Sequence, residues 1–158
     1  MPIWWTAAKD IGPVLKVKRL HPDVALPAYA RPGDSGMDLR ARHVDGVARG
    51  KWFVHAQESL CFGTDIAIEI PPGYEGQVRP RSSMGKRGLV AVLGTIDSGY
   101  RGEIGVVLHN HGRFSEEIKH DERIAQLVIV PVASCEVVEC DELSETERGA
   151  GGFGSTGK

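Results

Sequence analysis

The residues that could do chemistry lie in five short polar segments of this 158-residue chain. One of them, residues 94–103, places Asp97 and Tyr100 among glycines between two apolar runs, which predicts a hairpin. A carboxylate on such a hairpin can accept a proton from an attacking water, which is general-base chemistry. Aspartate is also a common turn residue, so this segment alone does not distinguish catalysis from turn formation.

A second segment, residues 79–85, has the residue types of an anion-binding site. Arg81 is followed by Ser82 and Ser83. A guanidinium, hydroxyls and the backbone N–H groups of a short helical turn can all bind phosphate oxygens. A helix N-cap would explain either serine equally well.

Two further segments place polar side chains near the starts of strands. Residues 32–39 form a glycine-rich turn with Asp38 at a strand start, and turn chemistry is the simple explanation. Residues 121–127 form a polar turn leading into an apolar strand that carries Gln126. We expect Gln126 to face inward among hydrophobic neighbours, where an amide needs hydrogen-bond partners.

The last segment, residues 148–157, is a glycine-rich tail, and a frayed terminus is the usual interpretation of such a sequence. It nevertheless contains one cation, Arg148, one ring, Phe153, and the hydroxyls of Ser155 and Thr156. Those groups can hold a phosphate and stack on a base, on a backbone able to approach an anion closely.

The elements that must position these segments have the periodicity of strands. With 20 glycines and nine prolines between short apolar runs, the chain predicts an all-β sandwich, jelly roll or barrel. Short helical turns are expected over residues 83–87 and around 116–118. The predicted β-rich runs are residues 14–17, 66–70, 89–93, 104–108, 124–132 and 135–138.

Composition excludes several classes of protein. The net charge of −2 argues against nonspecific binding to nucleic acid or to a membrane surface, both of which need a positive field. No apolar run approaches the roughly 20 residues that span a bilayer, and the first residues do not resemble a signal peptide. The three cysteines form no Cys-x-x-Cys pair. We therefore expect reduced thiols and a cytoplasmic protein, or a host-cytoplasmic one if it is viral.

Taken together and in this order, the five segments resemble the trimeric dUTPase family. The most specific stretches are residues 94–102, 123–127 and 148–157. The resemblance implies a jelly-roll-like β-barrel that forms a homotrimer, with each active site assembled from three subunits. It also implies an N-terminal extension over residues 1–13, a barrel domain over 14–142 and a flexible glycine-rich C-terminal arm over 143–158.

The activity implied by the resemblance is hydrolysis of dUTP to dUMP and diphosphate with Mg²⁺. Such a reaction limits uracil incorporation into DNA and supplies dUMP for dTMP synthesis. Asp97 would activate the water that attacks the α-phosphorus, and Asp38 would contact Mg²⁺ through water while the substrate phosphates hold the ion. The implied substrate contacts are Arg81, Ser82, Ser83, Gly94, Thr95, Ile96, Tyr100, Gln126, Arg148, Phe153, Gly154, Ser155 and Thr156.

The sequence departs from the family pattern in three places. Residues 84–93 are a few residues shorter than in common members and lack the asparagine often found before the third segment. Ser83 stands where many members have glycine, and Asp121 replaces a glycine expected in the fourth segment.

Two other functions are open at this point. The related dCTP deaminases share the fold but use a glutamate in the strand after residues 94–103, where this chain has Val107. A nucleotide-responsive regulator would instead use a protein partner, for which Trp4 and Trp5 are candidate anchors. Packing of these tryptophans on the protein itself is the simpler interpretation.

A transition-metal site at His109, His111 and His120 would lack a carboxylate or thiol at ligand spacing.

Overall fold

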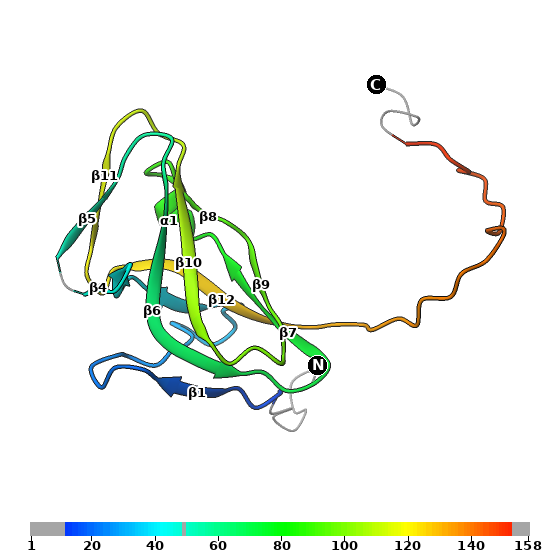
Figure 1. The fold of residues 1–158 in the computed structure, drawn as a ribbon, viewed down its shortest axis with the longest axis horizontal. Coiled ribbons are helices and arrows are strands. Elements are labelled where there is room, and N and C mark those ends of the chain that lie inside the picture. Colours follow the sequence, from blue (N-terminus) through cyan, green and yellow to red (C-terminus); the bar gives the residue numbers. More distant parts are fainter. Residues whose placement is uncertain (1–11, 49, 153–158) are drawn as a thin grey trace, which may run out of the picture.

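The computed structural model describes residues 12–48 and 50–152 (Figure 1). This part of the chain is built from strands and one short helix, which confirms the all-β prediction. The elements are β1 (Lys16–Arg19), β2 (Met37–Arg40), β3 (His43–Val44), β4 (Val47–Ala48), β5 (Lys51–Val54), β6 (Ser59–Glu69), β7 (Tyr74–Arg79), α1 (Ser82–Gly85), β8 (Leu89–Ala91), β9 (Gly94–Ile96), β10 (Glu103–Asn110), β11 (Glu116–Lys119) and β12 (Arg123–Pro131).

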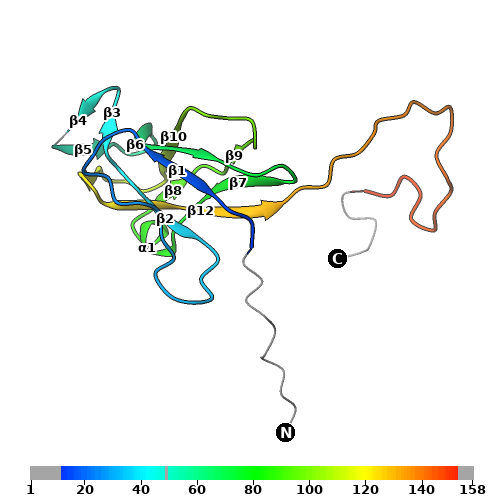
Figure 2. The same cartoon turned by 90° about the horizontal axis from the view of Figure 1, so that it is seen from below.

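The strands form three antiparallel sheets. One runs β4-β3-β6-β10-β8 with β1 also paired to β6, one runs β2-β12-β7-β9, and β11 pairs with β5. Figure 2 shows the first two sheets stacked as layers. The alternating pattern of β10 explains the stacking, because Ile104, Val106 and Leu108 are buried while Val107 faces outward. The core between the layers contains Phe62, Leu39, Ile124 and Leu127.

Two predicted elements are wrong. Residues 116–118 form part of strand β11 rather than a helical turn, because Ile118 is buried opposite Trp52 of β5. Residues 135–138 form no strand: β12 ends at Pro131, and the chain then leaves the barrel (Figure 1). Val137 is 95% exposed, so this apolar run finds neither a strand nor a core surface to pack against within the described residues.

The predicted hairpin around Asp97 is also wrong. Strand β9 pairs with β7, whereas β10 pairs with β6 and β8, so residues 97–102 cross from one sheet to the other. The sheet to which each strand belongs is fixed by its partners far along the chain, and the sequence between the two strands carries no information about this. The loop therefore sits at an opening between two layers.

Two polar clamps hold the loops around the barrel end. Fully buried Asn110 donates to the carbonyls of Val54 and Phe114, each at 2.8 Å, and its Oδ1 accepts the Gly112 N–H at 2.8 Å.

The second clamp is Arg87, whose Nε and Nη1 donate to Glu116 and Glu122 at 2.9 and 2.7 Å. Burial of the guanidinium opposes its charge, but these two hydrogen bonds outweigh it and raise the pKa of Arg87. Arg87 therefore ties the chain after α1 to β11 and to the turn before β12 as a fixed cation.

The chain after β12 extends away from the barrel (Figure 1). Residues 132–152 belong to no strand or helix and are almost wholly exposed. The described residues include no helix long and apolar enough to cross a membrane. Cys61, Cys135 and Cys140 are free thiols, as expected.

Candidate active site

A polar cleft lies where β2, β12 and the start of α1 meet. It brings together five residues that the sequence predicted as functional, namely Asp38, Arg81, Ser82, Ser83 and Gln126. In Asp38, Oδ1 lies 3.0 Å from Arg81 Nε, and Oδ2 accepts a 3.2 Å hydrogen bond from Arg123 Nη1. The lining residues are Ala30, Asp34, Ser35, Gly36, Asp38, Arg81, Ser82, Ser83, Arg123 and Gln126.

Gln126 does not face the core as predicted. It is half-buried in the cleft, and its Nε2 donates to the Pro80 carbonyl at 3.0 Å. Register explains this placement, because Gln126 is paired with Asp38 across β2 and opposite side chains share a face. A Cβ on Gly36 would lie 2.6 Å from Gln126 Oε1, so only glycine there leaves room for the amide.

Arg123 is a cleft residue that sequence reasoning missed. Positions 123 and 126 would point to opposite faces of a regular strand. A bulge between Arg123 and Ala125 breaks the alternation, because two steps along β12 match one step along β2. The guanidinium therefore reaches Asp38 from the same side as the Gln126 amide.

The two serines of the second segment are exposed at the start of α1. Arg81 occupies the N-cap position, and no side chain caps the helix by a hydrogen bond. The N-cap explanation for Ser82 or Ser83 is therefore wrong, and both hydroxyls line the cleft. Buried Met84 anchors the turn beneath them.

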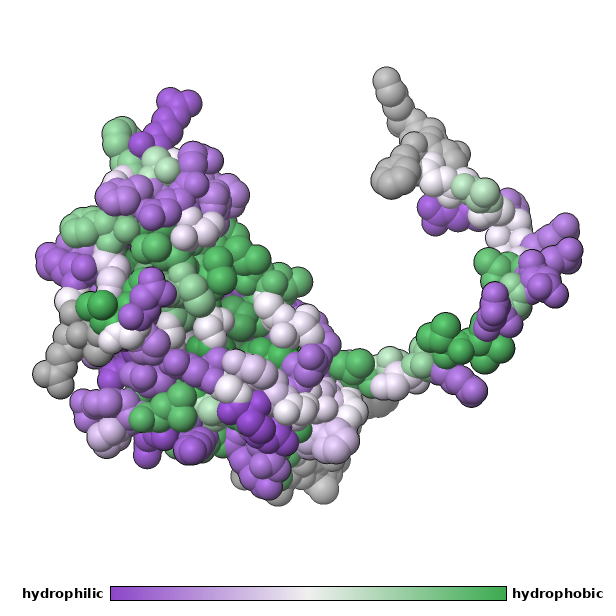
Figure 3. Space-filling model, in the orientation of Figure 1, coloured by the Kyte–Doolittle hydropathy of each residue, from purple (hydrophilic) through white to green (hydrophobic). Residues whose placement is uncertain are grey.

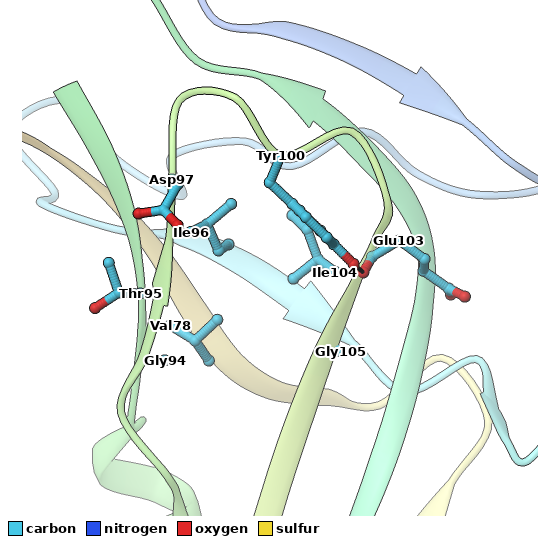
Figure 4. Close-up of a pocket in the computed structure, with 9 residues that line it drawn as sticks. All are labelled: Val78, Gly94, Thr95, Ile96, Asp97, Tyr100, Glu103, Ile104 and Gly105. Atoms are coloured by element: carbon cyan, nitrogen blue, oxygen red, sulfur yellow. Dashed lines mark hydrogen bonds between the residues drawn. The ribbon is translucent and has the colours of Figure 1, made fainter. Parts of the chain in front are cut away.

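A second cavity, of about 230 Å³, lies beside the loop that connects β9 to β10 (Figure 4). Its floor is apolar and its rim carries Asp97 and the Tyr100 ring. The sequence predicted its strand β9 residues and both rim residues, but missed Val78 and the start of β10. The lining residues are Val78, Gly94, Thr95, Ile96, Asp97, Tyr100, Glu103, Ile104 and Gly105.

Backbone and side-chain hydrogen bonds close the loop that carries Asp97. The Tyr100 N–H donates to the Asp97 carbonyl at 3.0 Å, and Arg101 Nη1 donates to the carbonyls of Ser98 and Tyr100 at 2.6 and 2.8 Å. The Tyr100 hydroxyl donates to the Glu103 carbonyl at 3.0 Å. Since a Cβ on Gly102 would lie 2.3 Å from that hydroxyl, the folded-back ring requires glycine there.

The cleft and the cavity have no lining residue in common. The structure thus gathers the predicted residues into two groups, one around Asp38 and one around Asp97. Arg148 lines neither: it lies on the exposed arm, where its Nε donates to the Gly151 carbonyl at 2.9 Å. The predicted contacts Phe153, Gly154, Ser155 and Thr156, and the tryptophans Trp4 and Trp5, lie outside the described residues.

The three histidines that were weighed as a transition-metal site, His109, His111 and His120, do not form a metal-ligand group among the described residues. The rings of His109 and His111 are 4.3 Å apart, but His120 packs against Trp52 instead. The described group that could hold a metal ion is His43, Asp65 and Glu103, whose ligand atoms lie within 4.8 Å of one another.

The geometry of this second group does not favour a metal ion. Glu103 Oε1 already accepts the Asp65 N–H at 2.6 Å and contacts His43 Nε2 at 2.9 Å. A metal-bound histidine normally donates its other ring N–H to an acceptor. His43 Nδ1 is buried without a hydrogen-bond partner in the described part of the chain.

The structure is thus an all-β protein with a polar cleft that contains arginine and serine side chains, and with a separate, mostly apolar cavity. A family profile described as dUTPase matches residues 23–157. The chain belongs to the dUTPase family, which consists of hydrolases.

Two curated relatives and a solved structure illustrate the similarity. The deoxyuridine 5'-triphosphate nucleotidohydrolase of Hydrogenobaculum sp. is 51% identical over 90% of this chain and 97% of its own length. That of Nautilia profundicola is 48% identical over 91% and 99%. A variant of the Staphylococcus bacteriophage 80alpha dUTPase, solved with dUpNHpp, has a TM-score of 0.77 at 29% identity, covering 92% of this chain and 99% of that one.

Proposed function

We propose that this chain hydrolyses dUTP to dUMP and diphosphate, with Asp97 as the general base. The observation that carries the proposal is the shared cavity of Asp97, Tyr100 and the β9 backbone (Figure 4). The aromatic ring and the apolar floor fit a nucleoside. Its phosphates would then extend out of the cavity toward the Asp97 carboxylate at the rim. Family membership supports the same substrate.

Asp97 suits the base role because it is exposed at the rim on a closed loop. A carboxylate there can orient a water and take its proton as the water attacks the α-phosphorus. The proton moves to the carboxylate, the new bond forms to the α-phosphorus, and diphosphate leaves.

Tyr100 and the β9 backbone would select the nucleoside. The Tyr100 ring is half-exposed and projects into the cavity, where it would lie under deoxyribose and leave no space for a ribose 2′-hydroxyl. Backbone groups of Gly94, Thr95 and Ile96 would pair with the uracil edge. Rejection of thymine would require that the pocket leave no space for a 5-methyl group.

The Asp38 cleft would hold the phosphates through Arg81, Ser82, Ser83 and Gln126. Its donor set fits Mg²⁺, which takes oxygen ligands and keeps several of its waters. Both Asp38 oxygens already face guanidinium groups, which supports contact with the ion through water rather than direct ligation. Bound Mg²⁺ would neutralise charge that builds on the phosphate oxygens.

We propose a homotrimer in which the cleft of one copy and the cavity of another form one site. The separation of the two in a single chain supports this arrangement. Figure 3 shows hydrophobic surface over the middle of the barrel face, and the strands there carry exposed Val107 and, just after β8, Val92 and Leu93. The arm with Arg148, Phe153, Gly154, Ser155 and Thr156 would close over bound nucleotide.

Deamination of dCTP is a poorer fit to the cavity. Val107 faces outward from β10, and the nearby carboxylate of Glu103 points away from the cavity (Figure 4). A deaminase needs a carboxylate beside the cytosine ring to shuttle protons.

A regulatory role remains an additional proposal. The phage 80alpha enzyme belongs to the phage dUTPases described as controlling transfer of virulence genes by a G protein-like mechanism. In this chain, Trp4 and Trp5 are the residues with which to test for a partner. Removing residues 1–10 should leave hydrolysis intact and abolish capture of that partner, whereas lost trimerisation would assign the tryptophans to the protein's own interface.

The general-base role is tested by Asp97→Asn, with Asp23→Asn on an exposed loop as the matched control. We expect dUTP binding to stay near wild type in Asp97→Asn while kcat falls by at least about 100-fold, the range for loss of a general base. Unchanged turnover would remove Asp97 from the role.

Site sharing is tested by complementation. Asp97→Asn and Arg81→Ala proteins, each inactive alone, should regain part of the activity when unfolded together and refolded as a mixture. No recovery from mixed trimers would place the whole site within one chain.

A further inference from the structure

Behind the nucleoside cavity, strand β6 carries a large bulge opposite the start of β10. Glu103 pairs with Ala67 but Gly105 pairs with Gly63, so two steps along β10 match four along β6. At the bulge, Asp65 adopts a positive φ of 54°. A bulge redirects the backbone and its side chains, so a fixed shape at this bulge requires contacts that stabilise it.

Three side chains, which we call the clasp, hold the bulge: His43, Asp65 and Glu103. Glu103 Oε1 accepts the Asp65 N–H at 2.6 Å, so a carboxylate replaces the ladder partner that the bulge removes. The same oxygen lies 2.9 Å from His43 Nε2, which lies 3.7 Å from Asp65 Oδ1. Arg42, itself buried, donates to Asp65 Oδ2 at 3.2 Å and fixes that carboxylate from the other side.

Gly63 leaves the space that the clasp side chains occupy. A Cβ on Gly63 would lie 2.1 Å from the His43 ring and 2.7 Å from Glu103 Oε1. The three clasp side chains are only 20–29% exposed, so their hydrogen bonds are partly shielded from water.

The clasp is joined to the cavity through one residue. Glu103 sends its carboxylate away from the cavity, toward β6, while its backbone carbonyl accepts the Tyr100 hydroxyl at 3.0 Å (Figure 4). The carbonyl that anchors the Tyr100 hydroxyl and the carboxylate that the clasp holds therefore belong to one residue.

We propose that Glu103 is a positioning residue that sets discrimination against ribonucleotides by holding Tyr100 through the clasp. The inference rests on the proposed role of Tyr100 under the sugar. The Glu103 carboxylate points away from the cavity, so it would act through Tyr100 rather than on the nucleotide. Its contribution is to keep the hydroxyl anchor of Tyr100 in one place, so that the ring excludes a 2′-hydroxyl.

The test compares kcat/KM for dUTP and UTP in the intact protein. Glu103→Ala removes the clasp acceptor, Tyr100→Phe removes only the link to the Glu103 carbonyl, and Glu103→Gln keeps an acceptor oxygen. The matched control is Glu69→Gln, which removes a carboxylate at the end of β6, the strand that carries the bulge, but outside the clasp. Amide hydrogen exchange at Asp65 reports on the clasp without reference to activity.

We expect Glu103→Ala and Tyr100→Phe each to lower the dUTP/UTP ratio by about 3- to 10-fold, the loss of one hydrogen bond. Their double variant should show little further loss, because both act on one link. Glu103→Gln should restore most of the ratio, and the Asp65 amide should exchange faster in Glu103→Ala than in Glu103→Gln or the control.

Three results would overturn the inference, and they separate it from the proposed function. If Tyr100→Ala lowers the dUTP/UTP ratio while Glu103→Ala keeps the wild-type ratio, Tyr100 discriminates the sugar but the clasp does not contribute. Additive losses in the double variant would show that Glu103 does not act through the Tyr100 hydroxyl. An unchanged dUTP/UTP ratio in Tyr100→Ala would overturn the proposed role of Tyr100 under the sugar, and the role of Glu103 with it.

Discussion

Replacing Gly36 with alanine should disable the polar cleft without unfolding the protein. Gly36 has no positive φ, so its backbone accepts alanine. The new Cβ would lie 2.6 Å from Gln126 Oε1 and 3.0 Å from its Cβ and Cδ. Rotation of the Gln126 side chain out of the cleft can relieve the contacts with Oε1 and Cδ. Because Gln126 Cβ is fixed by the backbone, its contact also needs a shift of a few tenths of an ångström between the two segments.

The magnitude follows from what Gln126 is proposed to bind. A hydrogen bond to a charged group contributes about 1.5–3 kcal/mol, which corresponds to a loss of about 10- to 150-fold in kcat/KM for dUTP. The assay is diphosphate release from dUTP over a range of concentrations. Thermal unfolding should shift little, because the cleft is open and the core is untouched.

The matched control is Gly85→Ala, in the helix beside the cleft, where an added Cβ meets nothing within 4 Å. It should keep kcat/KM within about twofold, since surface changes usually have small effects. Gln126→Ala should match Gly36→Ala, and the double variant should lose little more. Wild-type kinetics in Gly36→Ala, or additive losses in the double variant, would refute the proposed role of Gln126.

Three further predictions concern the arm, the barrel and the thiols. Removing the residues after Glu147 should abolish most turnover while far-UV circular dichroism stays that of the folded barrel; an unfolded product would make the arm structural. Asn110→Ala should cost at least about 3 kcal/mol in urea denaturation, because two carbonyls and one N–H lose their partner at about 1–3 kcal/mol each. A cost below about 1 kcal/mol would contradict that count. Burial, then Asp45 and Glu103, raise the pKa of the Cys61 thiol, so at pH 8 its thiolate fraction is reduced and iodoacetamide should modify it more slowly than Cys135; equal rates would argue against the raised pKa.

The fold class and most of the side chains that line the cleft and the cavity could be predicted from the sequence, because β-rich runs and polar motifs are local features. The β-rich runs over residues 104–108 and 124–132 predicted strands that the structure contains. The motif residues Arg81, Asp38 and Gln126 meet in one cleft because paired strands bring them there.

What the sequence could not predict depends on long-range pairing. The orientation of Gln126 depends on its register with Asp38, and the position of Arg123 on a bulge that local alternation does not reveal. The clasp joins His43, Asp65 and Glu103 across three strands, with no shared motif. The crossing of residues 97–102 between sheets follows from partners of β9 and β10 elsewhere in the chain.

Asp121 shows how a departure from the family pattern can be accommodated. The family glycine is replaced, yet the residue keeps a positive φ of 65°. Its carboxylate accepts from Arg42 at 3.2 Å and Arg40 at 3.4 Å. These two contacts offset the strain of a left-handed aspartate, a cost on the order of 1 kcal/mol.

The most direct measurement is diphosphate release by the purified protein from dUTP, UTP, dCTP and dTTP in parallel, with and without Mg²⁺. We predict rapid release from dUTP with Mg²⁺, little from the other nucleotides, and loss of the dUTP signal in Asp97→Asn. No release from dUTP with Mg²⁺ present, or equal release from dUTP and UTP, would contradict a nucleoside cavity built around Asp97 and Tyr100.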